Sequence, residues 1–290
     1  MRGGHGAGVL FIASFLLSVV APSRPAMAAT RSTGQILYEY DCTIHAVNPD
    51  GTGDTALTDG GCDSAPEWSP DRSQIAFIST RDDLNGDIFV MDADGSDQVN
   101  LTGWRGAKRD LFPTWSPDGT RIAFCGDTPY TIYSIYIIDL IDGSLTSVGG
   151  STLNCSGVTW SPDGSTIVFS ADYGTLHFAL YAVNPDGSNF RVLINTGGND
   201  VFPDFSPDGR QIVFERDGNG RAWVMVAGSA GTALKRVSPA TALDWFPVWS
   251  PDGRQIAFDV HSDIWVMNAN GTGRYDIAKD PYHYEDWPDW

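Results

Sequence analysis

The sequence predicts an all-β protein, a six-bladed β-propeller built from four-stranded antiparallel blades. Three observations lead to this fold class. A phrase of the form Trp-Ser-Pro-Asp-Gly recurs at nearly even spacing, and each copy is followed by short apolar strands and a tight Asp-Gly or Asn-Gly turn. The acidic residues are 32 Asp and only 4 Glu. Because aspartate favours turns and glutamate favours helices, this composition indicates many turns and few helices.

The repeat sets the number of blades. Its aromatic position is occupied six times, with steps of 41 to 47 residues between copies. These positions are Trp68, Trp115, Trp160, Phe205, Trp249 and Trp290. A repeat of this length with four short strands leaves no room for a long helix and favours a propeller over a sandwich. Six aromatic positions predict six blades rather than an open or seven-bladed ring.

Each element of one repeat can be assigned in order. The aromatic residue ends the first strand, and the Ser-Pro-Asp-Gly turn follows because proline fixes φ and aspartate bonds back to the backbone. In the first full copy the second strand is centred on residues 75–77 and the third on 87–91. The Asp94-Gly95 pair predicts a hairpin turn, since such turns require positive φ. The fourth strand ends at Leu101-Thr102.

The two ends of the chain complete one blade. Residues 35–58 match the second, third and fourth strands of a repeat but lack a first strand. The segment 288–290 matches the first strand of a repeat but lacks the second, third and fourth strands. We therefore expect the C-terminal strand to pair with the N-terminal blade and close the ring, which removes exposed sheet edges.

The N-terminus has the features of a secretory signal peptide. A charged start precedes an apolar run over 9–21 and small residues that end at Ala26-Met27-Ala28. The run of ~13 residues is shorter than the ~20 that a transmembrane anchor needs. The predicted organisation is a signal peptide over 1–28, a short segment over 29–34 and the propeller over 35–290. We expect an exported protein, periplasmic or extracellular, whose formal net charge of −18 disfavours nucleic-acid binding.

Export permits disulfide bonds, and the four cysteines fall at matching places in two repeats. Cys42 and Cys125 each follow the second strand of their repeat. Cys62 and Cys155 each lie in the connection that leads to the next aromatic position. Because both pairs join the same two loops, the sequence predicts the bonds Cys42–Cys62 and Cys125–Cys155 rather than free thiols.

Two faces of the ring differ in sequence. The turn face carries the Ser-Pro-Asp-Gly and Asp-Gly turns, which are nearly the same in every blade. The variable face carries the loops between the second and third strands and the connections between blades, and variation of this kind marks binding. Acidic residues recur there about five positions before the aromatic one, and ring geometry should place them around the channel mouth. This predicted acidic mouth comprises Asp63, Asp110, Asp200, Asp244, Glu285 and Asp286.

The acidic mouth has two interpretations. Its carboxylates could attract a cation such as Ca²⁺ or a basic peptide. They could instead bond the backbone of their own connecting loops, which is the interpretation we favour. The aromatic residues Phe112, Phe202, Phe246 and Trp287 are interpreted as packing between blades rather than as a ligand platform. Glu67 and Glu215 are interpreted as solvated strand residues.

No established metal or catalytic motif is evident. The segment Asp83–Asp87 resembles a calcium loop without its full ligand register. The histidines occupy unrelated repeat positions, and a Gly-x-Ser-x-Gly elbow is absent from the sequence. The sequence therefore predicts no metal site and no cofactor, with Ca²⁺ in the channel as an alternative.

The repeat resembles that of the C-terminal propeller domain of the TolB family. The resemblance rests first on the pattern Pro-x-Trp-Ser-Pro-Asp-Gly-x-x-Ile-Ala-Phe, which residues 247–258 match in full. It rests also on Asp-Ile-Trp-Val-Met over 263–267 and on the Leu-Thr that closes a repeat. It covers nearly all of 35–290. TolB proteins carry an α/β domain before the propeller, and we expect that domain to be missing here.

The resemblance implies an exported scaffold that binds other molecules. We expect a non-catalytic module, because no catalytic constellation is recognisable in the sequence. We expect this module to bind a protein or a basic peptide as a monomer. A small exported lyase or hydrolase acting on carbohydrate is the alternative. A sensor or structural domain with calcium in its channel is a third interpretation.

Overall fold

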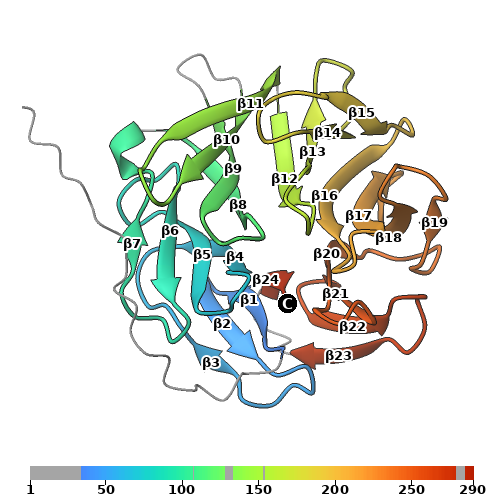
Figure 1. Cartoon of the computed structure of the whole chain (residues 1–290). Coiled ribbons are helices and arrows are strands. Elements are labelled where there is room, and N and C mark those ends of the chain that lie inside the picture. Colours follow the sequence, from blue (N-terminus) through green and yellow to red (C-terminus); the bar gives the residue numbers. More distant parts are fainter. Residues whose placement is uncertain (1–33, 107, 128–132, 153, 279–284) are drawn as a thin grey trace, which may run out of the picture.

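The protein forms the predicted six-bladed propeller (Figure 1). A computed structural model describes residues 34–106, 108–127, 133–152, 154–278 and 285–290. Within them, six four-stranded antiparallel sheets surround a central channel, and the first strand of each repeat lies innermost. The predicted signal peptide and most of the segment over 29–34 lie outside the described residues. Among those residues no helix is long and apolar enough to cross a membrane.

The strands follow the order of the repeat, and we number the blades along the chain. Blade 1 consists of β24 (Glu285–Asp289), β1 (Ile36–Tyr40), β2 (Thr43–Val47) and β3 (Thr55–Ala56). Blade 2 consists of β4 (Asp63–Trp68), β5 (Gln74–Ser79), β6 (Asp87–Asp92) and β7 (Val99–Asn100). The short 3₁₀ helix η1 (Gly103–Arg105) leads to blade 3, which consists of β8 (Asp110–Trp115), β9 (Arg121–Asp127), β10 (Tyr133–Asp139) and β11 (Leu145–Thr152).

The other three blades repeat this arrangement. Blade 4 consists of β12 (Asn154–Trp160), β13 (Ile167–Asp172), β14 (Ala179–Val183) and β15 (Arg191–Ile194). Blade 5 consists of β16 (Asn199–Phe205), β17 (Gln211–Gly218), β18 (Arg221–Gly228) and β19 (Lys235–Arg236). Blade 6 consists of β20 (Trp245–Trp249), β21 (Gln255–Asp259), β22 (Ile264–Asn268) and β23 (Tyr275–Ala278).

The Ser-Pro-Asp-Gly turn is held by the same hydrogen bonds in every copy. In blade 3 the Ser116 hydroxyl donates to Asp118 Oδ1 at 2.6 Å and accepts the Arg121 N–H at 2.9 Å. The turn ends at Gly119 with a φ of 68°, which glycine adopts without the steric cost that other residues incur. Blade 2 alone among the five full copies has a different residue there, Arg72, with a φ of 59°.

The core lies between neighbouring blades. The aromatic residue of each second strand is fully buried between adjacent sheets in five blades. These residues are Phe77, Phe124, Phe169, Phe214 and Phe258. The Leu-Thr ending of a blade also has a structural reason, because the Thr102 hydroxyl accepts the N–H of Ile88 at 3.0 Å. This bond joins the end of the fourth strand to the third strand.

The ring closes as predicted. Strand β24 pairs antiparallel with β1, with Leu37 opposite Asp289 and Tyr40 opposite Glu285 (Figure 1). Blade 2 holds this joint from the other side, since Trp68 N–H donates to Asp289 Oδ2 at 2.8 Å.

Both disulfides are formed as the sequence predicts. Cys42 joins Cys62, and Cys125 joins Cys155. The first bond links blade 1 to the connection before β4, and the second links β9 of blade 3 to β12 of blade 4. Each bond therefore fastens one blade to the next.

Candidate functional site

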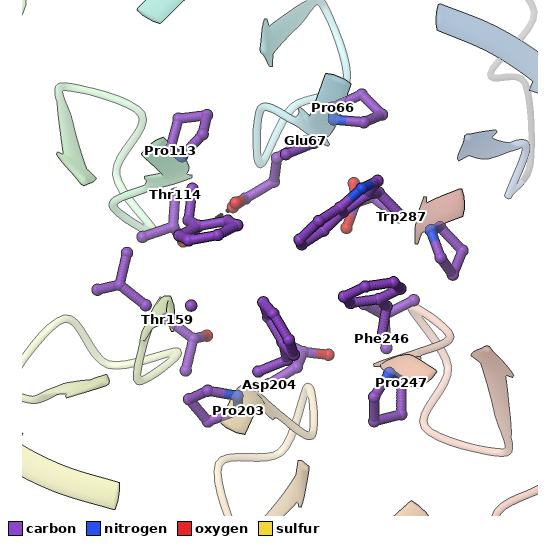
Figure 2. A pocket seen from close by; sticks show the side chains of 18 residues that line it. Pro66, Glu67, Pro113, Thr114, Thr159, Pro203, Asp204, Phe246, Pro247 and Trp287 are labelled. Atoms are coloured by element: carbon purple, nitrogen blue, oxygen red, sulfur yellow. Dashed lines mark hydrogen bonds between the residues drawn. The ribbon is translucent and has the colours of Figure 1, made fainter. Parts of the chain in front are cut away.

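A central channel runs along the axis of the ring, and side chains of the innermost strands line it (Figure 2). Three consecutive residues from the innermost strand of every blade line it, immediately before the repeat's aromatic position. Together they enclose a cavity of about 130 Å³. Because each first strand runs from the variable face to the turn face, the first of the three residues lies nearest the mouth on the variable face.

Aromatic rings fill the mouth of this channel. Phe246 and Trp287 stack with their ring centres 3.9 Å apart, and Phe202 meets Phe246 edge-on at 4.7 Å. Phe112 completes the cluster at 5.3 Å from Trp287. All four residues have positive φ, at the point where the pairing of the innermost strand shifts register. They pack across the channel, which agrees with their interpretation as packing residues.

A second layer of the channel contains three carboxyl groups. Glu67, Asp204 and Asp289 directly precede their aromatic residues, and each accepts the backbone N–H of the aromatic residue in the next blade, at 2.8 to 3.0 Å. Burial raises the pKa of Asp204 to about 7 and the pKa of Glu67 well above its ordinary value. The interpretation of Glu67 as a solvated residue is therefore wrong, because its carboxylate joins blades inside the ring (Figure 2).

Four members of the predicted acidic mouth are buried and carry arginine partners. Each is at most 1% exposed, so its negative charge is compensated within the fold. The pairs are Asp63–Arg81 at 2.8 Å, Asp110–Arg105, Asp200–Arg216 at 2.6 Å and Asp244–Arg274 at 2.6 Å. The partners of these carboxylates are thus arginine side chains, whereas the interpretation we favoured from the sequence gave them the backbone of their own connecting loops. In blade 4 the disulfide-bonded Cys155 occupies the position that these aspartates have in their own blades.

The remaining acidic position, Asp286, lies in a different setting. It is half-buried in β24 beside Asp259 of β21, and burial together with the Asp286 carboxylate raises the pKa of Asp259 to about 9. Glu215 of blade 5 occupies the place in the second strand that Asp259 occupies in blade 6. It is 2% exposed and accepts the Phe246 N–H at 3.1 Å. The interpretation of Glu215 as solvated is wrong. The side chain of Glu285 lies outside the described part of the structure.

Metal-ligating side chains gather at one further place. Within the described ranges, the only three such groups with ligand atoms inside 4.8 Å of one another are Glu39, Cys42 and Cys62. The two sulfur atoms belong to a disulfide, so they offer no thiolate. In the segment that resembles a calcium loop, Asp83 Oδ1 instead accepts two hydrogen bonds from Asn85 at 2.8 Å.

Large apolar side chains stand exposed on the variable face, which sequence reasoning missed. Leu84 is 93% exposed and Leu176 is 87% exposed, both in loops between second and third strands. Trp104 is 65% exposed in η1, in the connection from blade 2 to blade 3. The available signal was a large apolar residue in loops that are otherwise mostly polar, as in Asp83-Leu84-Asn85.

Comparison with known proteins gives a family and a set of similar folds. The family model described as TolB beta propeller domain matches residues 87–279. TolB from Acinetobacter baumannii is similar with a TM-score of 0.76 and 21% identity, over 89% of this chain and 66% of that one. The chain thus spans slightly less than two thirds of that TolB chain. We found no match among curated proteins.

Two other solved structures share the fold. A chain of the nidogen/laminin complex has a TM-score of 0.73 and 10% identity, over 88% of this chain and 97% of that one. An oligogalacturonate lyase in complex with manganese has a TM-score of 0.59 and 16% identity, over 82% of this chain and 71% of that one. At these identities the likeness concerns the fold alone.

Proposed function

The chain belongs to the TolB beta propeller domain family, and from this we propose that it is an exported, non-catalytic scaffold that binds a protein or peptide. The partner would contact the variable face around the channel mouth. Export to the periplasm or cell exterior is supported by the signal-peptide pattern and by two disulfides, which persist in oxidising compartments.

The observation that carries this proposal is the exposed apolar group on the variable face. Trp104, Leu84 and Leu176 are strongly exposed in loops and connections of the variable face. Exposed large apolar side chains mark contact surfaces, and tryptophan is among the residues that contribute most to binding. The turn face, by contrast, repeats the same hydrogen-bonded serine turn in blade after blade.

Charge supports a basic partner. The chain has a formal net charge of −18, and such a field attracts cationic groups and raises their rate of association. In this proposal Asp286 adds negative potential near the mouth. The four arginine-paired aspartates hold the connections of the variable face. Two of these pairs, Asp63–Arg81 and Asp110–Arg105, adjoin the segments of Leu84 and Trp104.

The test compares two faces of one propeller. A triple variant, Leu84→Ala with Trp104→Ala and Leu176→Ala, should lose at least tenfold in affinity for a partner captured from the exported fraction. Ile141→Ala is the matched control, because Ile141 is 69% exposed in a turn on the opposite face. Equal affinity of both variants and the unmodified protein in biolayer interferometry would refute the proposed surface.

A carbohydrate-cleaving enzyme is the second candidate, and the likeness to the oligogalacturonate lyase is what favours it. Purified protein incubated with oligogalacturonate and manganese would then release unsaturated sugar, detected by ultraviolet absorbance. Turnover that survives the triple loop variant would favour this candidate over the scaffold.

A further inference from the structure

An acidic group of a different kind lies at the joint where the ring closes. Asp259 is the last residue of β21 in blade 6, and Asp286 is the second residue of the closing strand β24. Their carboxyl groups lie within hydrogen-bonding reach of each other. Glu39 of β1 stands directly opposite Asp286 in the strand register. The carboxyl groups of Asp259 and Asp286 therefore meet at this joint, and Glu39 adds a third negative charge nearby.

These carboxyl groups lack the compensation found elsewhere on the variable face. Within the described ranges, none of the three forms an ion pair with lysine or arginine, although four aspartates in the other blades do. Asp259 is 1% exposed, and its Oδ2 atom has no hydrogen-bond partner among the described atoms. The other charged groups that face Asp259 are Asp263 and Glu215, which are also acidic.

Such an arrangement requires a positive charge. Like charges on opposed residues of a sheet oppose strand pairing, and a buried carboxylate without a partner is costly. A proton shared by Asp259 and Asp286 would meet the requirement, and so would a bound cation. Asp286 is only half-buried, so this pair of carboxyl groups is not sealed off from solvent.

We propose that a divalent cation of the Ca²⁺ type binds between Asp259 and Asp286 and fastens the closing strand to blade 6. Calcium prefers carboxylate oxygens and accepts irregular geometry completed by water. Glu39 would add negative potential rather than a ligand, because its carboxylate lies within 4.8 Å of the Cys42 and Cys62 sulfur atoms. The site lies at the joint between two blades, apart from the carboxyl groups inside the channel.

The first test is thermal unfolding of the purified protein at pH 8, with chelator or with calcium. At a calcium concentration tenfold above the dissociation constant, the Tm should rise by about 3 °C. Asp259→Asn and Asp286→Asn should each abolish this rise. Asp59→Asn removes an exposed carboxylate with the same change of charge and should leave the rise intact.

The second test locates the ion. Trp287 follows Asp286 in the chain, and Trp245 lies opposite Asp259 in the β20–β21 register. Terbium bound in place of calcium should therefore emit light when tryptophan is excited, and added calcium should quench this emission. The Asp286→Asn variant should show no such emission.

Two results would overturn the proposal. A Tm that depends on pH but is identical with chelator and calcium would mean that the carboxyl groups share only a proton. A calcium effect retained by the double variant Asp259→Asn with Asp286→Asn would place the ion elsewhere, for instance in the channel. Neither result depends on the partner, so both are distinguishable from a failure of the proposed function.

Discussion

Arg72 occupies a position that the repeat otherwise reserves for glycine. Its φ of 59° is unfavourable for a residue with a side chain, yet its guanidinium reaches the ring closure. Arg72 Nη2 donates to the carbonyl of Gln35 at 2.6 Å, and the guanidinium stacks over Trp68 at 4.6 Å. Its charge also lowers the pKa of Asp289 in the closing strand, against a larger rise caused by burial. We predict that restoring glycine at this position destabilises the protein.

The magnitude follows from two opposing effects. The left-handed backbone costs a residue with a side chain about 1–2 kcal/mol, which Arg72→Gly would recover. The same change removes a charged hydrogen bond worth about 1.5–3 kcal/mol and a cation–π contact worth about 0.5–1 kcal/mol. The midpoints of these ranges give an expected net loss of about 1.5 kcal/mol, or a fall in Tm of about 3–6 °C for a domain of this size.

Two further variants separate the effects. Arg72→Ala loses the same contacts but keeps the backbone strain, so it should be less stable than Arg72→Gly by about 1 kcal/mol. Gly119→Ala is the matched control, since its added Cβ would meet only Pro70 Cδ at 4.0 Å and would report the backbone cost alone. Urea unfolding provides the free energies of unfolding, and hydrogen exchange in β1 and β24 should quicken in both Arg72 variants.

One outcome would refute this reasoning. If Arg72→Gly is as stable as the unmodified protein, or more stable, the contacts of the guanidinium do not outweigh the strain of the turn. Exchange that quickens equally in blade 4, far from the joint, would likewise show that the side chain does not act on the closure.

Three other predictions concern charge and covalent links. Burial raises the pKa of several enclosed acids, with Asp259 at about 9, so the folded state holds protons that the unfolded chain releases. The free energy of unfolding should therefore fall as pH rises from about 4 to 9. Urea unfolding at constant ionic strength measures this fall. A mild reductant should open the half-exposed Cys42–Cys62 bond before the buried second bond, at a cost of about 3 kcal/mol, and alkylation with mass spectrometry would reveal the order. Asp244→Ala should cost about 3 kcal/mol because it leaves a largely buried arginine unpaired, whereas Arg210→Ala, which breaks an exposed pair with Asp208, should cost less than 1 kcal/mol in the same unfolding assay.

The fold could be predicted because its determinants are local and repeated. A turn such as Ser116–Gly119 needs the same residues in each blade, so the sequence records the blade count directly. Ring closure followed from one missing strand, and the disulfides followed from cysteines at equivalent places in two repeats.

The electrostatic character of the candidate site could not be predicted in the same way. The arginines that pair with the buried aspartates come from unrelated repeat positions. No constant sequence separation therefore links an aspartate to its arginine. Arg105 lies in a connection and Arg216 in a second strand, for example. The pairing of Asp259 with Asp286 joins different strands of different blades, and such proximity becomes visible only when the ring is assembled.

The closing strand has a consequence for the order in which the molecule is made. Blade 1 contains the earliest strands of the chain, β1 to β3, together with its latest strand, β24. During synthesis the earliest sheet must therefore wait, three-stranded and with an open edge, while all five other blades emerge. Long-range pairing of this kind is slow to form and exposed to mispairing. Both cysteines of the Cys42–Cys62 bond lie in the earliest part of the chain, so this link between blade 1 and blade 2 does not require the closing strand.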